Sequence, residues 1–147
     1  MNSHHLDAEA NLLKQLRGIK VLVVEDNLVV ASSLISLLEL CGIQVVGPAT
    51  TLPGAAAVAR AGAFDIALID LNLHGETSEN LIAMLCEVGV PVVVVTGHDV
   101  EPDTAAKVAA VLVKPFRSEQ LLDAIRQIVA DGTGARADRA SPVTAAA

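Results

Sequence analysis

The sequence predicts an α/β domain of the (βα)₅ type, in which a parallel sheet carries helices on both faces. Five short apolar runs alternate with segments of helical length. This strict alternation indicates parallel strands joined by right-handed crossovers. The runs are rich in β-branched residues and nearly continuous, as expected for strands that are buried on both faces. The chain has 147 residues, 52% of them hydrophobic, which suits one such domain.

The first half of the chain is predicted to form a strand, a helix, a second strand and a second helix. Asp26 or Asn27 follows the first strand and suits the cap of the first helix, and Gly42 suits its C-terminal stop. Pro53 stands where the first turn of the second helix tolerates it, and this helix is expected to end at Gly62. The expected ranges are 19–24, 29–40, 43–46 and 53–62.

The second half repeats this rhythm and adds one more strand. Ser118 is the expected cap of the final helix, with Glu119 in its first turn and apolar residues along one face. The strands are expected at 65–70, 91–96 and 110–113, and the helices at 78–88, 102–109 and 118–131.

Two segments lie outside this pattern, so the domain is expected to span residues 19–131. Residues 1–18 are expected to form a loosely amphipathic helical extension, whose apolar residues are Leu6, Leu12, Leu13 and Leu16. We expect this extension to dock on the domain or to fray, and pairing with a second copy as a homodimer is the alternative. Residues 132–147 have no apolar period and are expected to form a disordered tail.

Composition excludes several classes of function. A net charge of −7 disfavours binding to nucleic acid or to anionic membranes, and 1% aromatic residues leaves almost nothing for base stacking. The two cysteines, Cys41 and Cys86, fit neither a disulfide framework nor metal-ligand spacing. Since the sequence has no signal peptide and no apolar run long enough for a membrane span, we expect a cytoplasmic protein.

Polar residues follow the predicted strands, and parallel strands bring their carboxyl ends to one edge of a sheet. Glu25 and Asp26 follow the first strand, and Asp70 ends the third. Three carboxylates at one edge repel one another unless a cation lies among them, and Mg²⁺ prefers such oxygen ligands. Thr96 and Lys114 end the fourth and fifth strands and add a hydroxyl and a positive charge, both suited to a phosphoryl group.

These residues indicate a carboxylate nucleophile that acts on phosphate with the help of a metal ion. The sequence contains no Ser-His-Asp or Cys-His arrangement and no Gly-rich phosphate loop that would indicate a different kind of catalytic site. Each residue also has a plainer interpretation. In that interpretation, Asp70 is only a turn residue that follows a strand, and Glu25 has no role beyond being adjacent to Asp26. Thr96 would then simply end its strand.

Four short motifs occur in a fixed order along the predicted strands. They are Glu25-Asp26-Asn27, Asp70-Leu71-Asn72-Leu73, Thr96-Gly97 and Lys114-Pro115-Phe116. In these motifs the chain resembles the receiver domains of two-component response regulators, typified by CheY, over about residues 19–131. The resemblance implies a flavodoxin-like, doubly wound parallel sheet with strand order 2-1-3-4-5.

The resemblance also implies a role for each motif residue. Asp70 would be the phosphoacceptor, and Mg²⁺ would be bound by Asp26, Asp70 and the backbone carbonyl of Asn72, with Glu25 acting through a water. Thr96 and Lys114 would bind phosphoryl oxygens, and the Lys114–Pro115 peptide bond would be cis. Asn72 and His98 would tune the access of hydrolytic water, although an exposed loop side chain is the plainer interpretation of His98.

The chain departs from the usual receiver pattern at three places. The switch aromatic expected three residues before the lysine is Val111, so the ordinary threonine-to-aromatic coupling is missing. The proline that commonly stands four residues after the phosphoacceptor is His74. The short interval between Thr96 and Lys114 predicts a fourth helix that is short or partly disordered. The sequences of segments 70–76 and 95–98 resemble the corresponding segments of receivers that are paired with HWE-type histidine kinases.

The expected function is therefore that of a stand-alone receiver rather than an enzyme. It would accept a phosphoryl group from a histidine kinase or a phosphotransfer protein, and would signal through protein partners or act as a phosphate relay or sink. One alternative is a receiver fold used as a non-switching interaction module. Another is a haloacid-dehalogenase-like phosphatase, which needs a second Asp where Asn72 stands.

Overall fold

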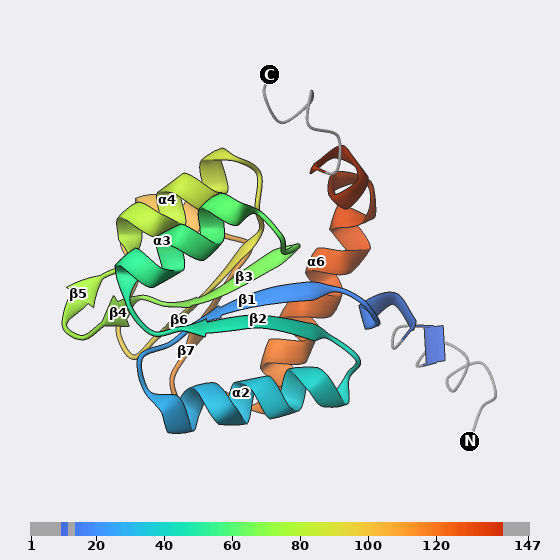
Figure 1. The fold of residues 1–147 in the computed structure, drawn as a ribbon, viewed down its shortest axis with the longest axis horizontal. Helices are drawn as coiled ribbons and strands as arrows, with labels where there is room; N and C mark the ends of the chain where they lie inside the picture. The colour runs from blue at the N-terminus through green and yellow to red at the C-terminus, as the bar shows by residue number, and fades with distance from the viewer. Residues whose placement is uncertain (1–9, 12–13, 140–147) are drawn as a thin grey trace.

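The computed structural model describes residues 10–11 and 14–139, with side chains described up to residue 132. Five parallel strands form one sheet in the order β2-β1-β3-β6-β7 (Figure 1). Numbered along the sheet strands alone, this is the order 2-1-3-4-5, and the predicted fold class is confirmed. The strands are β1 (Lys20–Val24), β2 (Gln44–Ala49), β3 (Ile66–Asp70), β6 (Val92–Thr96) and β7 (Ala110–Val113).

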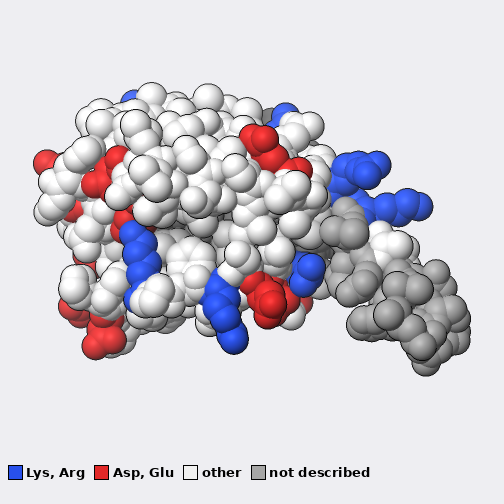
Figure 2. All heavy atoms as spheres, turned by 90° about the horizontal axis from the view of Figure 1, so that it is seen from below, with Lys and Arg blue, Asp and Glu red and all other residues white. Residues whose placement is uncertain are grey.

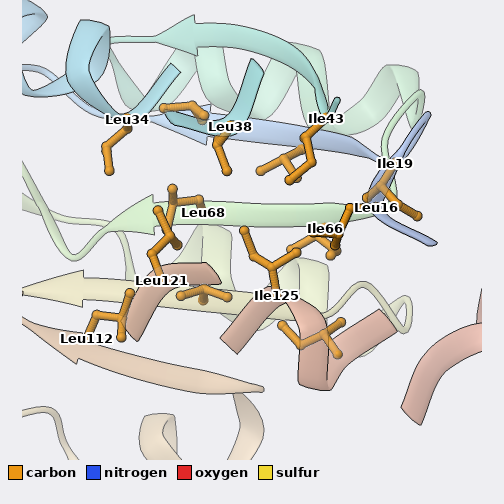
Figure 3. Packing of buried hydrophobic residues seen from close by; sticks show 14 of the residues in the cluster. Leu16, Ile19, Leu34, Leu38, Ile43, Ile66, Leu68, Leu112, Leu121 and Ile125 are labelled. Carbon is orange, nitrogen blue, oxygen red and sulfur yellow. The ribbon is translucent and has the colours of Figure 1, made fainter. Parts of the chain in front are cut away.

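Helices cover both faces of this sheet and enclose two hydrophobic clusters. On one face lie α2 and α6, and Figure 3 shows their side chains flanking Leu68 of β3. On the other face lie α3, α4 and α5, with α3 and α4 visible above the sheet in Figure 1. The helices are α2 (Leu28–Leu40), α3 (Leu52–Ala61), α4 (Glu79–Glu87), α5 (Pro102–Lys107) and α6 (Ser118–Arg139).

The strand β1 illustrates why the central strands are apolar at every position. Val21 and Val23 belong to the cluster beneath α2 and α6, whereas Leu22 and Val24 belong to the opposite cluster. Successive strand residues point to opposite faces, so a strand with helices on both sides has no solvent face on which polar residues are favoured.

Two helix ends carry residues that were expected to cap them, whereas Ser118, the expected cap of the final helix, is instead the first residue of α6. The side chain of Asn27, and not that of Asp26, accepts the Val29 and Val30 N–H groups at 3.0 and 3.1 Å and caps α2. At the end of α3, Gly62 takes the left-handed conformation with a φ of 70°. Asp26 is therefore free of capping and available to the edge of the sheet.

The edge strand β2 is longer than the predicted range 43–46. It begins at Gln44 and continues to Ala49 through a cis Gly47–Pro48 bond, with a register shift against β1 between Leu22 and Val24. A Cβ atom on Gly47 would lie 2.8 Å from the Ala49 nitrogen, so only glycine fits there. An edge strand tolerates Pro48 because the missing N–H removes no bond from a central ladder.

Other elements differ from the sequence prediction in their presence or in their limits. A small antiparallel hairpin, β4 (Asn72–Leu73) with β5 (Glu76–Thr77), follows β3, in a segment for which the sequence predicted neither strand nor helix. The fourth helix of the pattern, α5, is short, as predicted, and its six residues end at Lys107 rather than at residue 109. The last helix, α6, continues past the predicted end at residue 131 to Arg139, although Gly132 and Gly134 have low helix propensity.

The N-terminal extension contacts the domain through Leu16. This side chain is fully buried in the cluster beneath α2 and α6, whereas Leu6, Leu12 and Leu13 lie outside the described residues. Of the predicted tail, residues 140–147 also lie outside them. Among the described residues, no helix is both long enough and apolar enough to cross a membrane.

Candidate functional site

The carboxyl ends of the central strands bring the predicted site residues to one edge of the sheet. Parallel pairing aligns Asp70 of β3 with Val95 of β6, and Thr96 with Val113 of β7. One carboxylate oxygen from each of Glu25, Asp26 and Asp70 lies within 4.8 Å of the others. Figure 2 shows acidic side chains gathered at the left end of the molecule, the same end at which Figure 1 shows the β4–β5 hairpin.

Lys114 is the cation that faces these carboxylates. Its Nζ donates to Asp70 Oδ2 at 2.9 Å and lies 3.8 Å from Glu25 Oε2. Burial opposes the charged form of Lys114 and by itself would lower its pKa. The hydrogen bond to Asp70 and the negative charges of Asp70, Glu25 and Asp26 outweigh this effect, so the pKa of Lys114 is raised. Lys114 therefore faces three carboxyl groups, and it stays protonated at neutral pH.

Glu25 is the most buried of the three carboxyl groups, with 2% of its surface exposed. Burial, followed by the hydrogen bond and negative charge of Asp70, raises the pKa of Glu25 from 4.5 to about 7. Its Oε1 accepts the Asn27 N–H at 3.3 Å, which ties it to the start of α2. A bound cation would favour the ionised form of this group.

Asp26 lies in a different environment, because its side chain is one-quarter exposed. Its Oδ2 accepts the backbone N–H of His74 at 2.8 Å, and the His74 Nδ1 lies 3.7 Å from the same oxygen. The backbone hydrogen bond is the main reason why the pKa of Asp26 lies below its usual value. Asp26 is therefore ionised at neutral pH.

Asp70 is held at its side chain and at its carbonyl. Its Oδ1 accepts the Asn72 N–H at 3.1 Å, and its carbonyl oxygen accepts the hydroxyl of Ser78 at 2.7 Å. Ser78 is fully buried, and its hydroxyl makes no cap bond to α4. Sequence reasoning missed this contact, because a serine just before a helix is normally a helix cap.

Thr96 is almost fully buried, and its hydroxyl is engaged with the loop that follows it. The Oγ1 accepts the His98 N–H and donates to the His98 carbonyl oxygen, both at 3.0 Å. Its own carbonyl accepts the Lys114 N–H at 2.7 Å and holds the two strand ends together. The hydroxyl must leave His98 before it can donate to another group.

The sequence also singles out Pro115, Val111, His98 and Asn72. The Lys114–Pro115 peptide bond is cis. Val111 is partly buried against the cluster beneath α3 and α4, and His98 is exposed. Asn72 is also exposed, although its backbone N–H contacts Asp70.

The three carboxyl groups form a donor set for the metal ion that the sequence implies. All three converging ligand atoms are carboxylate oxygens, and the side chains of Asp26 and Asp70 are 25% and 9% exposed. Such a set suits a hard divalent cation that keeps part of its water shell, as Mg²⁺ does. The residues present therefore fit the ion.

Comparison with known proteins gives one family match. Residues 21–126 match the family model of the response regulator receiver domain, which covers most of the chain. No curated protein sequence matches the chain.

Solved structures of CheY-like receiver domains share the fold. One from Methylobacillus flagellatus is 25% identical, with a TM-score of 0.68, and the match covers 76% of this chain and 98% of that one. One from Methanospirillum hungatei JF-1 is 22% identical, with a TM-score of 0.71, and the match covers 80% and 98%. A response regulator from Burkholderia pseudomallei, solved with a phosphorylated aspartic acid, a calcium ion and citrate, is 28% identical, with a TM-score of 0.65 and coverage of 81% and 73%.

Proposed function

Because this chain belongs to the response regulator receiver domain family, whose members are signalling receivers rather than turnover enzymes, we propose that Asp70 accepts a phosphoryl group from a histidine kinase or a phosphotransfer protein. The observation that carries the proposal is the contact of 2.9 Å between Lys114 Nζ and Asp70 Oδ2 at the edge where three carboxylates meet. The arrangement leaves Asp70 ordered, paired with a cation and 9% exposed at its side chain.

The proposed transfer is a displacement at phosphorus. An Asp70 carboxylate oxygen attacks the phosphorus of a phosphohistidine, the new P–O bond forms as the P–N bond breaks, and the imidazole leaves with the electron pair of that bond. Lys114 then exchanges its carboxylate contact for a phosphoryl oxygen. Asp26, Asp70 and the Asn72 carbonyl would hold Mg²⁺, with Glu25 acting through a water, and the bound ion would offset the negative charge of the phosphoryl oxygens.

Thr96 and the loop after it complete the proposed phosphoryl site. To donate to a phosphoryl oxygen, the Thr96 hydroxyl gives up its bond of 3.0 Å to the His98 carbonyl. This exchange couples phosphorylation to the loop at 97–101. Exposed Asn72 and His98 flank the site and are proposed to tune the access of hydrolytic water.

The test is covalent labelling by acetyl phosphate in the presence of Mg²⁺, followed by intact mass spectrometry. We expect the protein to gain one phosphoryl group, and Asp70→Asn to abolish the gain. Asp103→Asn, which changes an exposed carboxylate in α5, is the matched control and should label normally. Undiminished labelling of Asp70→Asn would overturn the proposal.

The proposed partner is an HWE-type histidine kinase, which implies a cytoplasmic site of action. Support comes from the strings at 70–76 and 95–98, and the net charge of −7 favours a protein over a nucleic acid as the receiver of the signal. A phosphotransfer profile against HWE-type and other histidine kinases checks this pairing. Preferential transfer from a kinase of another type would contradict it.

A non-switching interaction module is the second candidate, and two observations favour it. Val111 stands at the position of the switch aromatic, and α5 has no buried residue. Beryllium fluoride mimics the phosphoryl group, so amide exchange that stays unchanged on its addition would support this candidate. The phosphatase alternative loses its basis, because Asn72 stands at the position of its second Asp and the chain belongs to the receiver family.

A further inference from the structure

The β4–β5 hairpin touches two carboxylates of the site through its backbone. Its first residue, Asn72, donates its N–H to Asp70 Oδ1 at 3.1 Å, and His74 at its tip donates its N–H to Asp26 Oδ2 at 2.8 Å. These contacts bridge strand ends that are far apart in the sequence. The hairpin is therefore part of the wall of the site.

The base of the hairpin is anchored in the core. The buried hydroxyl of Ser78 donates towards the carbonyl oxygens of Asp70 and Leu71, at 2.7 and 3.0 Å, and the Ser78 N–H donates to Leu71 at 2.7 Å. Leu73, in β4, is 1% exposed and belongs to the cluster beneath α3 and α4. Because base and strand are fixed, the position of the tip is fixed relative to Asp26.

The turn at the tip needs two residues with positive φ. His74 has a φ of 51° and Gly75 a φ of 81°, as in the two-residue turns whose twist matches an antiparallel hairpin. Proline is locked at a φ near −65°, so it cannot adopt this turn. It also has no N–H, so it cannot donate a backbone hydrogen bond to Asp26. The turn therefore excludes proline at a position where receivers commonly carry it.

We propose that the β4–β5 hairpin positions Asp26 for the metal ion, and that His74 acts through its backbone N–H rather than through its imidazole. The His74 side chain is 62% exposed, whereas the N–H contact is short and directed at one carboxylate oxygen. The other oxygen of Asp26 then remains for the cation. This inference rests on the proposed function, because it assumes that Mg²⁺ binds at Asp26 and Asp70.

Three substitutions at His74 separate the backbone from the imidazole. His74→Asn removes the imidazole but keeps the N–H and tolerates positive φ. His74→Val keeps the N–H but disfavours positive φ, and His74→Pro loses both. Each variant is compared with the unchanged protein by calorimetric titration with MgCl₂ and by labelling with acetyl phosphate at limiting and saturating Mg²⁺.

A backbone role predicts a graded loss of Mg²⁺ affinity in the order Asn, Val, Pro. We expect His74→Asn to stay within about twofold of the unchanged protein and His74→Pro to bind Mg²⁺ about tenfold more weakly, the effect of one charge-assisted hydrogen bond. The labelling rate of His74→Pro should recover at saturating Mg²⁺, which a general loss of folding would not allow. Far-UV circular dichroism of the metal-free variants checks the fold.

The outcomes distinguish this inference from the function on which it rests. If the unchanged protein binds no Mg²⁺, both fail. If the unchanged protein binds Mg²⁺ and His74→Pro binds it equally well, only the positioning role fails. If His74→Asn loses as much affinity as His74→Pro, the imidazole is the active group and the backbone role is overturned.

Discussion

Glu25 and Asp26 are neighbours in the sequence, yet their carboxyl groups have opposite electrostatic surroundings. Glu25 points into the protein beside Asp70, where burial raises its pKa to about 7. Asp26 points to the surface, where the His74 N–H lowers its pKa. Successive residues after a strand alternate in direction, so one acid enters the sheet edge and the next faces the hairpin.

This difference predicts that the metal-free protein loses stability as the pH rises from about 4.5 to about 7. The folded state holds the Glu25 proton that the unfolded chain, with a pKa of 4.5, releases first. The stabilisation is complete below pH 4.5 and lost above pH 7, and it amounts to at most about 3 kcal/mol. The pKa of Asp26 is lowered instead, so Asp26 changes the stability only at pH values below this window.

Urea unfolding in a chelating buffer, followed by far-UV circular dichroism because the chain has no Trp or Tyr, measures this dependence. Glu25→Gln, which imitates the protonated group, should flatten the curve between pH 5 and 7. Glu76→Gln, at an exposed position, should leave it as it is. Equal slopes for the unchanged protein and Glu25→Gln would contradict the prediction.

Among the helices, α5 is the one in which no residue described by the structure is buried. It has six residues and none is buried, whereas α4 has nine residues and buries Leu81, Ile82 and Leu85. A helix this short has little stability of its own in water and depends on packing. The loop and helix after Thr96 are therefore the part of the site that changes position at the lowest cost.

We predict that the amides of α5 exchange with solvent at least about tenfold faster than those of α4, because local opening exposes no core side chain. Hydrogen exchange of the unphosphorylated protein, read by mass spectrometry or NMR, measures both helices in one experiment. Equal protection of α4 and α5 would show that α5 is held by contacts beyond those described.

The whole molecule is stabilised by two separate clusters, one on each face of the sheet. The cluster beneath α2 and α6 reaches past the predicted domain boundary at residue 19, because Leu16 is fully buried in it, as Figure 3 shows beside Ile19. The Gly18 N–H also donates to the Gly42 carbonyl at 3.1 Å and closes that end of the sheet. The last turn of the N-terminal extension is thus part of the domain core.

Leu16→Ala is therefore expected to lower the free energy of unfolding by about 2–5 kcal/mol, the cost of emptying a packed leucine site. Leu40→Ala is the matched control, because Leu40 is 85% exposed, and it should change stability by less than about 0.5 kcal/mol. Urea unfolding compares the two variants. A cost below 1 kcal/mol for Leu16→Ala would mean that the extension adds nothing to the core.

The sequence by itself determined the order of strands and helices, the parallel sheet and the edge at which Glu25, Asp26, Asp70, Thr96 and Lys114 meet. These features follow from local periodicity and from the geometry of parallel strands, which depend on residue type and spacing alone. The residues at which each strand and helix begins and ends were less predictable. The strand β2 runs through Gly47–Pro48 because it lies at the edge of the sheet, and strand position is a tertiary property.

Only the tertiary structure decided how the acids are held and how they differ. The contacts of His74 with Asp26 and of Lys114 with Asp70 join residues 48 and 44 positions apart. Local propensity carries no information about such pairs. The burial that separates Glu25 from Asp26 likewise depends on what packs around each side chain. Residue types specify the chemistry that meets at the sheet edge, and packing sets the charge and orientation of each group there.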